Sequence, residues 1–111
     1  MKDLTKIEEI LLIAIWRLKA EAYGVKIRQN VSKLINKDFT YGNLYSALNQ
    51  LTQKNYVVKH QGNTVPERKG RPRIVYEITP SGYEALRDTQ EMNNLLWDGI
   101  EKIAFDQVCK Q

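Results

Sequence analysis

The stretch that decides the fold is residues 40–54, TYGNLYSALNQLTQK. Its apolar side chains recur at helical spacing, which predicts an amphipathic helix from Tyr41 to about Lys54, with Thr40 as the N-cap. The inward face would hold Leu44, Ala47, Leu48 and Leu51. The outward face would hold small and amide side chains: Gly42, Ser46, Asn49 and Gln53, flanked by Asn43 and Gln50. An amide-rich helix face is usually only a solvated face, but small residues permit close approach and amides hydrogen-bond base edges, so this face also suits a DNA major groove.

Two further helices are predicted before this segment. The helix predicted over residues 4–20 is apolar almost all round. Its main apolar stripe is formed by residues 7, 10, 11, 14 and 18, and residues 12, 13, 15 and 16 fill the faces beside that stripe. Such a helix must be covered on more than one side, so we assign Trp16 to the core and expect a second cover from the C-terminal helix or a partner chain. The next helix opens at Tyr23–Gly24 and is broken by residues 36–38. Its inward residues would be Ile27, Val31, Leu34 and Ile35.

Two strands are predicted after it. Asn55 stands where a helix commonly stops in the left-handed conformation. Residues 56–60 and 73–78 then carry the β-branched and aromatic side chains typical of strands. The stretch between them, residues 61–72, has Gly or Pro at positions 62, 66, 70 and 72 and is too long for a tight turn. We expect a long loop there.

This loop concentrates positive charge. Residues 66–73, PERKGRPR, hold one anion and four cations, which are Arg68, Lys69, Arg71 and Arg73. Three helices, a strand, a basic loop and a strand follow one another as in a winged helix-turn-helix, whose third helix enters the major groove while the wing contacts backbone or minor groove. The predicted fold class is therefore mainly α with a small β-hairpin wing. Arginines in the wing would bind phosphates and give salt-sensitive, sequence-independent affinity.

A last helix is predicted from about residue 81 to 108, with Pro80 in its first turn. At 1.5 Å per residue it would be roughly 40 Å long, longer than a domain of this size is wide. Its distal half carries an apolar stripe that nothing further along the chain would cover: Met92, Leu96, Trp97, Ile100, Ile103, Ala104 and Val108. We therefore expect a DNA-binding domain at residues 1–79 and a C-terminal dimerisation helix at residues 80–111.

Charge separates the same two regions. Residues 1–79 hold 14 Lys/Arg and 7 Asp/Glu, whereas residues 80–111 hold 3 and 6. A basic body and an acidic tail predict a polyanionic partner for the first and a different partner for the second. The longest apolar run, residues 10–16, is too short to span a bilayer, and the acidic pair before it does not fit a signal peptide. We expect a cytoplasmic protein without a membrane partner.

Residues suited to catalysis are sparse. The chain has one histidine, His60, and one cysteine, Cys109, and no Gly-Lys-Ser/Thr phosphate loop follows Gly70. No nucleophile–base pair or metal-ligand cluster is visible, so we expect no enzyme, no cofactor and no metal. His60 has the character of a structural or solvated residue.

Four segments resemble the PadR-type transcriptional regulators, and together they cover nearly the whole chain. They are AYGVKI (22–27), TYGNLYSAL (40–48), GRPR (70–73) and YEITPSG (76–82). Each is weak alone, but four in this order and spacing are specific. The chain departs from the family's pattern at Asn43, where Thr or Ser is commoner, at Ser46, where Pro is commoner, and at Asn55, where Gly is commoner. Asn43 and Ser46 lie on the outward face of the helix predicted at residues 41–54, which we call the reading face, so they would affect which operator is recognised.

The resemblance implies a homodimer in which each last helix packs on the partner's first and last helices. Two reading helices would then enter successive major grooves, about 34 Å apart, of a pseudo-palindromic operator. It also implies repression of transcription and, in some members, release from DNA by a small hydrophobic effector. The expected DNA contacts, from the resemblance and the reading face together, are Tyr23, Lys26, Thr40, Tyr41, Gly42, Asn43, Tyr45, Ser46, Asn49, Arg68, Lys69, Arg71 and Arg73. The expected dimer interface is Ile7, Leu11, Met92, Leu96, Trp97, Ile100, Ile103 and Val108. Such a regulator would work in the bacterial cytoplasm, at the nucleoid.

Three alternatives stay open from the sequence. Trp97 would either stack on a flat effector or belong to the dimer core. Tyr41 and Tyr45 would either contact phosphate through their hydroxyls or pack at the helix edge. The whole protein would otherwise be a winged-helix protein-interaction module without DNA binding, although such a module has no need of a basic wing.

Overall fold

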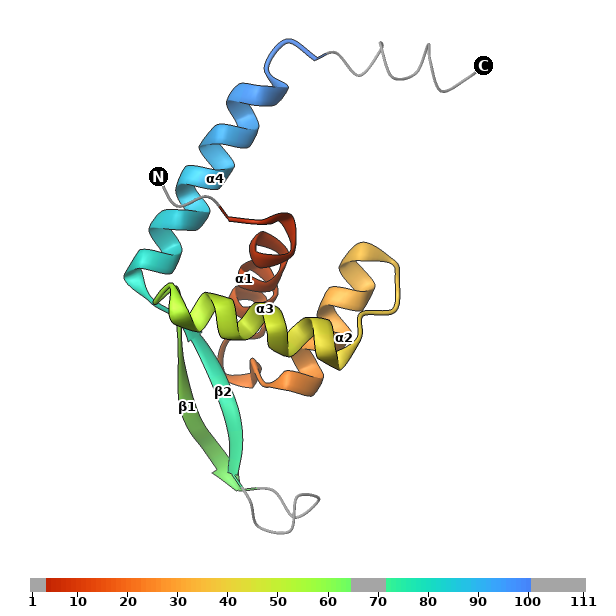
Figure 1. The fold of residues 1–111 in the computed structure, drawn as a ribbon, viewed down its shortest axis with the longest axis vertical. Helices are drawn as coiled ribbons and strands as arrows, with labels where there is room; N and C mark the ends of the chain where they lie inside the picture. The colour runs from red at the N-terminus through yellow and green to blue at the C-terminus, as the bar shows by residue number, and fades with distance from the viewer. Residues whose placement is uncertain (1–3, 65–71, 101–111) are drawn as a thin grey trace.

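The computed structural model describes residues 4–64 and 72–100 of the chain (Figure 1). This part of the chain forms four α-helices, one 3-10 turn and a two-stranded antiparallel hairpin. In chain order they are α1 (Lys6–Leu18), the 3-10 turn (Lys19–Glu21), α2 (Gly24–Ile35), α3 (Tyr41–Gln53), β1 (Val57–Thr64), β2 (Pro72–Ile78) and α4 (Pro80–Trp97). This is the winged-helix arrangement that the sequence predicts.

Helix α1 is the centre of the core. Its residues Leu11, Leu12 and Ala14 have no exposed surface, and α2, α3, β2 and α4 all pack against it. The inward leucines of α3 are fully buried as predicted: Leu44, Leu48 and Leu51. Burying each such side chain contributes about 2 kcal/mol, so these two helices supply much of the stability of the body.

The first turn of α1 is fixed by a capping box and a buried ion pair. Thr5 Oγ1 accepts from the Glu8 amide at 3.1 Å, and the Thr5 amide donates to Glu8 Oε1 at 2.8 Å. The Glu8 side chain is almost wholly buried and accepts from Lys54 Nζ at 2.8 and 3.0 Å. This pair ties the start of α1 to the end of α3. The predicted helix over residues 4–20 is slightly too long, because the chain tightens into the 3-10 turn after Leu18.

One junction joins α3, the hairpin and α4. Asn55 adopts the left-handed conformation predicted for it, at φ 63°, and the Tyr56 amide donates to the Leu51 carbonyl. The Thr79 hydroxyl donates to the Asn55 carbonyl at 2.6 Å, and the Thr79 amide donates to the Tyr56 carbonyl at 3.0 Å. At Gly82, an added Cβ would overlap the Tyr56 carbonyl oxygen, so only glycine lets α4 lie this close to the chain between α3 and β1.

The hairpin is longer than predicted. Its register runs from Val57↔Ile78 to Gln61↔Ile74, with an irregularity between Gln61 and Thr64. The side chains of Val57, Tyr76 and Ile78 are buried on its inner face. The loop predicted for residues 61–72 is therefore wrong at both ends, since residues 61–64 and 72 belong to the strands, and residues 65–71 lie outside the described part.

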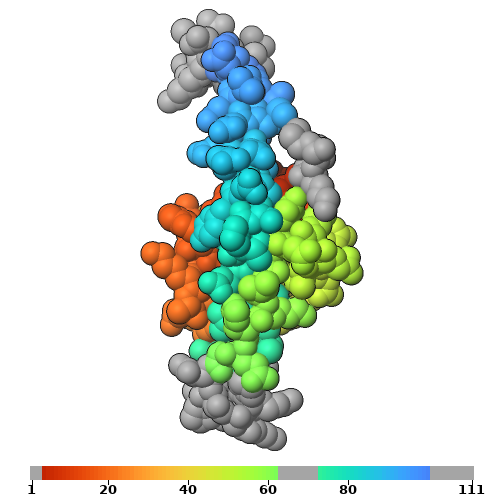
Figure 2. Space-filling view, turned by 90° about the vertical axis from the view of Figure 1, so that its left-hand side faces the viewer, coloured from red at the N-terminus to blue at the C-terminus, as the bar shows by residue number. Residues whose placement is uncertain are grey.

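Helix α4 projects from the body in the direction opposite to the hairpin (Figures 1 and 2). Gly82 and Ala85 are buried against the body, and Asn93 is half-buried. The helix ends at Trp97, because Asp98 is extended and Gly99 takes a positive φ of 83°. The predicted helix to residue 108 is therefore wrong at its far end. Residues 101–111, with the expected interface residues Ile103 and Val108, lie outside the described part. None of the helices in residues 4–64 and 72–100 has the length and apolar character needed to cross a membrane.

Candidate nucleic-acid interface

The outward face of α3 is exposed along its whole length. Its exposed residues are Gly42, Asn43, Ser46, Asn49, Gln50 and Gln53. Thr40 is the N-cap, as predicted, and its Oγ1 accepts from the Asn43 amide at 3.1 Å. Side-chain amides and small residues thus share one solvent-facing helical surface, which is the geometry required for hydrogen bonds to base edges.

Two tyrosines flank this face. The rings of Tyr41 and Tyr45 stack with their centroids 6.3 Å apart and an interplanar angle of 17°. Each side chain remains nearly half exposed. The Tyr45 hydroxyl lies against Gly24, where a Cβ would overlap it. Glycine at the start of α2 therefore lets α3 approach α2 closely.

The base of the wing is attached to the start of α2. The Tyr76 amide donates to the Ala22 carbonyl at 2.8 Å, and Tyr23 forms an isolated antiparallel bridge with Val75. The Arg73 guanidinium carbon lies 4.1 Å from the centroid of the Tyr23 ring, a cation–π contact. The structure thus brings together Tyr23 and Arg73, two of the expected DNA contacts that are far apart in the sequence.

A buried tyrosine supports this surface from inside. The Tyr76 side chain is only 5% exposed. Burial raises the pKa of its phenol above the ordinary 10.0, and the neighbouring Tyr45 phenol raises it further. Tyr76 is therefore neutral at physiological pH, and its role is to pack the wing onto the body.

One cation at this surface was missed by sequence reasoning. Arg28 extends from α2, its guanidinium carbon lies 4.6 Å from the centroid of the Tyr41 ring, and its Nη2 lies 3.1 Å from Asp38 Oδ1. No local signal reveals this contact, since Arg28 and Tyr41 lie on different helices. We call Tyr23, Tyr41 and Tyr45 the tyrosine band; Arg28 lies over the Tyr41 ring and Arg73 over the Tyr23 ring.

The remaining expected DNA contacts are placed only in part. Lys26 lies in the first turn of α2 and is half-buried. Arg68, Lys69 and Arg71 lie outside the described residues.

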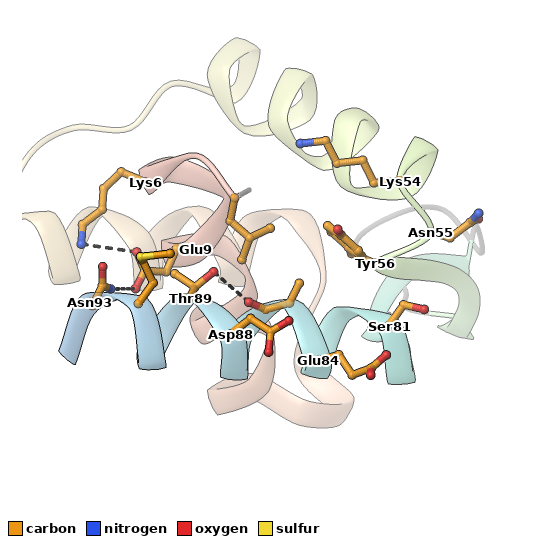
Figure 3. A pocket seen from close by; sticks show the side chains of 13 residues that line it. Lys6, Glu9, Lys54, Asn55, Tyr56, Ser81, Glu84, Asp88, Thr89 and Asn93 are labelled. Atoms are coloured by element: carbon orange, nitrogen blue, oxygen red, sulfur yellow. Dashed lines mark hydrogen bonds and ion pairs between the residues drawn. The ribbon is translucent and has the colours of Figure 1, made fainter. Parts of the chain in front are cut away.

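A groove of about 800 Å³ runs along the other side of the body, between α4 and the ends of α1 and α3 (Figure 3). Glu9 lies at one end, where Oε1 is 3.4 Å from Lys6 Nζ and Oε2 accepts from Asn93 Nδ2 at 3.1 Å. Glu84 and Asp88 line its α4 wall. Three carboxylates therefore line the groove beside two lysines, Lys6 and Lys54, so the groove is less favourable to phosphate than the α3 face.

A second hollow, of about 460 Å³, lies between the end of α1, the hairpin and the start of α4. Trp16 and Tyr83 line it and are both about half exposed. The assignment of Trp16 to the core is therefore wrong: the side chain lies at the edge of this hollow, in the last turn of α1.

The distal end of α4 exposes apolar side chains. The exposed fractions are 75% for Leu95, 64% for Leu96 and 58% for Trp97, and Met92 and Ile100 are also exposed. Leu11 was expected in a dimer interface, but this expectation is wrong because Leu11 has no exposed surface within the single chain. Ile7 is half-buried and packs against the core.

The fold and the surface together define a winged-helix protein whose third helix exposes an amide-bearing face and whose surface tyrosines Tyr23 and Tyr41 each carry an arginine. The sequence profile described as "Transcriptional regulator PadR-like family" matches residues 11–88. The chain therefore belongs to the PadR-like family of transcriptional regulators and is a DNA-binding regulator, and the resemblance inferred from the sequence is confirmed.

Solved structures agree on the fold. A PadR-like transcription factor from Bacteroides fragilis is 22% identical, with 87% of this chain and 88% of that chain covered and a TM-score of 0.68. A transcriptional regulator from Clostridium thermocellum is 23% identical, with 85% of each chain covered and a TM-score of 0.67. RosR from H. salinarum is 22% identical, with 99% and 98% covered and a TM-score of 0.67. A search of curated proteins gave no match.

Proposed function

We propose that this protein binds a specific double-stranded DNA operator as a homodimer and represses transcription. The observation that supports this most directly is the exposed amide-bearing face of α3 beside the tyrosine band and its two arginines. Sequence-specific recognition requires donors and acceptors for base edges together with cations for phosphates, and the amides of α3 and the two arginines would supply them.

The proposed roles divide between two parts of the chain. Residues 1–79 would bind DNA, and residues 80–111 would form the dimer. The exposed leucines at the end of α4 support the second role, since a soluble protein rarely leaves clustered large apolar side chains in water. We place the seam at Met92, Leu95, Leu96, Trp97 and Ile100, with Ile7 of α1 at its edge.

A two-fold dimer of this kind would present two α3 helices to successive major grooves, about 34 Å apart, on a pseudo-palindromic site. Arg73 and the remaining wing cations, Arg68, Lys69 and Arg71, would then contact the flanking backbone. The protein would act where the chromosome lies, in the cytoplasm of a bacterial cell. The rival proposal, an interaction module that does not bind DNA, does not explain why Arg28 and Arg73 each lie over a tyrosine ring at this surface.

A small hydrophobic effector is an extension of this proposal. Trp97 is more than half exposed at the proposed seam, where a flat molecule would stack on its indole. Such a ligand would change the angle between the two α4 helices and move the reading helices out of register. Titrating planar hydrophobic compounds into a Trp16→Phe variant isolates the Trp97 fluorescence, and unchanged emission across them would remove this extension.

The test of the main proposal is a fluorescence-anisotropy titration of labelled duplexes. The natural duplex is the DNA upstream of the protein's own gene, and the control duplex has the same composition in scrambled order. Each is titrated at low and at near-physiological salt, with wild type and with the double variant Asn43→Ala/Asn49→Ala, which removes two amides from the reading face.

We expect wild type to prefer the natural duplex by about 100-fold or more at near-physiological salt. The double variant should lose most of this preference while it retains its affinity for scrambled DNA, because the phosphate contacts remain. Equal, salt-labile binding of wild type to both duplexes would contradict sequence-specific regulation at this site. Absence of binding to either would favour the interaction module.

A further inference from the structure

Arg28 occupies a position between α2 and α3 that packing alone does not explain. Its guanidinium lies over the Tyr41 ring at 4.6 Å and reaches Asp38 Oδ1 at 3.1 Å. Tyr41 is the first residue of α3, and Asp38 belongs to the turn before it. The guanidinium therefore lies beside the first turn of the reading helix.

The contact with Asp38 leaves this guanidinium incompletely satisfied. Asp38 is 80% exposed, so the pair is screened by water and held weakly. Arginine has five N–H donors, and the Arg28 Nε is buried without a hydrogen-bond partner in the part of the chain that the structure describes. A buried donor without an acceptor costs free energy, so the hydrogen-bonding capacity of Arg28 is not fully used in the present arrangement.

The surroundings of Arg28 match those of Arg73. Arg73 lies over the ring of Tyr23 at 4.1 Å, and Arg28 lies over the ring of Tyr41 at 4.6 Å. A flat ring limits how a guanidinium can rotate. The N–H donors along the edge of the guanidinium then remain available to an acceptor with two oxygens, such as a carboxylate or a phosphate. The tyrosine band thus holds one arginine on each side of the region where α3 meets the start of α2.

We propose that Arg28 is a second arginine that binds the DNA backbone, held by Tyr41 and occupied by Asp38 until a phosphate replaces that carboxylate. The inference rests on the proposed function, because the acceptor is the phosphate backbone of the same duplex. Bidentate geometry suits a guanidinium and a phosphate better than the single contact with Asp38. Asp38 then acts as a competitor that lowers affinity for every DNA sequence equally.

The experiment measures the salt dependence of binding to a scrambled duplex for Arg28→Met, Asp38→Asn and wild type. Lys33→Met is the matched control, since it removes the same charge from an exposed position in the last turn of α2. Thermal unfolding of each variant checks that the fold is retained. Arg28→Lys keeps the charge but lacks the planar fork, and Tyr41→Leu removes the ring on which Arg28 rests.

We expect Arg28→Met to reduce the slope of log K against log salt by about 0.9, the value for one lost phosphate contact. Lys33→Met should leave the slope close to that of wild type. Asp38→Asn should tighten binding several-fold, and Arg28→Lys and Tyr41→Leu should weaken it by less than Arg28→Met does. These effects should be the same for the natural and the scrambled duplex.

A slope for Arg28→Met equal to that of wild type would overturn this inference and leave the proposed function intact. An equal loss in Lys33→Met would also overturn it, since the effect would then come from net charge. If wild type bound neither duplex, the proposed function and this inference would fall together.

Discussion

The wing and the distal end of α4 project from opposite ends of the body, and they expose opposite chemistry (Figure 1). At the wing end, Arg73 presents a cation beside the Tyr23 ring. At the α4 end, Leu95, Leu96 and Trp97 present apolar surface. A cationic surface is completed by a polyanion and an apolar surface by another apolar surface, so the contrast identifies two different kinds of partner.

The two projections nevertheless share one origin. The hairpin begins just after Tyr56, α4 begins just after Thr79, and the Thr79 amide and hydroxyl bond the Tyr56 and Asn55 carbonyls. An element proposed to bind DNA and an element proposed to bind a second subunit are thus fixed to the same point at the end of α3. The contrast between them is testable by variants that remove one end and leave the other.

The largest effect is expected at the α4 end. Leu95→Glu/Leu96→Glu should weaken self-association by at least about 100-fold, which is about 2.7 kcal/mol, because two charges would have to be desolvated in the seam. Sedimentation velocity measures this as a shift from dimer to monomer. Asn94→Asp is the control, since it changes the charge of an exposed neighbour. A double variant that still sedimented as a dimer would place the seam elsewhere.

The next largest effect is expected at the junction of α3, the hairpin and α4, where a substitution should lower the free energy of unfolding. Gly82→Ala introduces a methyl group that overlaps the Tyr56 carbonyl oxygen, so α4 must move away from the body. We expect a loss of about 2 kcal/mol in the free energy of unfolding, measured by urea denaturation. Ser81→Ala, at the exposed neighbouring position, should be nearly neutral. Equal midpoints for the two variants would show that the junction is not tightly packed.

The third largest effect is expected at the buried Glu8–Lys54 ion pair of the body. Burial raises the pKa of Glu8, but the Lys54 hydrogen bonds, the Thr5 amide and the Lys54 charge outweigh it, so the pKa falls below the ordinary 4.5. Glu8→Gln keeps the capping-box geometry and loses the charge. We expect it to cost about 1 kcal/mol at pH 7, because Lys54 is partly exposed.

The pH dependence of this cost follows from the lowered pKa. The stabilisation from ionised Glu8 is complete above about pH 4.5 and is lost as the pH falls through the lower pKa of the folded state. Wild type and Glu8→Gln should therefore converge in stability on acidification, which urea denaturation between pH 3 and pH 7 measures. A gap that stayed constant over this range would mean that the carboxylate charge contributes nothing.

The smallest effect is expected at the wing end. Arg73→Ala should weaken binding to any duplex several-fold, roughly 1 kcal/mol, and reduce the salt slope by about 0.9. It should leave the dimer unchanged in sedimentation velocity, which is the converse of the leucine variants. Arg87→Ala removes the same charge from α4 and should alter neither measurement. A monomeric Arg73→Ala protein would contradict the proposal that DNA binding and self-association belong to different ends of the molecule.

Local patterns allowed much of the fold to be predicted. The spacing of Leu44, Leu48 and Leu51 predicted the inward face of α3, and Thr40 and Asn55 predicted its two ends, because caps and helical periodicity depend on neighbours in sequence. The end of α4 was also within reach. Gly99 is a recognised helix-stop signal, but the apolar residues beyond it continue the helical pattern and led to a helix predicted to run about ten residues too far.

Contacts between distant segments were beyond such reasoning. The stacking of Arg28 on Tyr41, the Glu8–Lys54 pair and the burial of Leu11 depend on how whole helices cross, which no short spacing encodes. The reading face of α3 was predictable because exposure there follows from the same periodicity as burial on the other side. Which of its amides would meet which base in the proposed complex depends on the operator.

The exposed end of α4 can be exchanged without disturbing the packing of the body. Asn93 is the last residue of the helix that is half-buried, and every residue from Asn94 to Ile100 is exposed. Protein engineers can therefore exchange the segment after Asn93 for a self-associating helix without touching the core, the junction at Gly82 or helix α3. The spacing between two reading heads then becomes a design variable, set by the geometry of the grafted helix and read out directly as the preferred separation of half-sites.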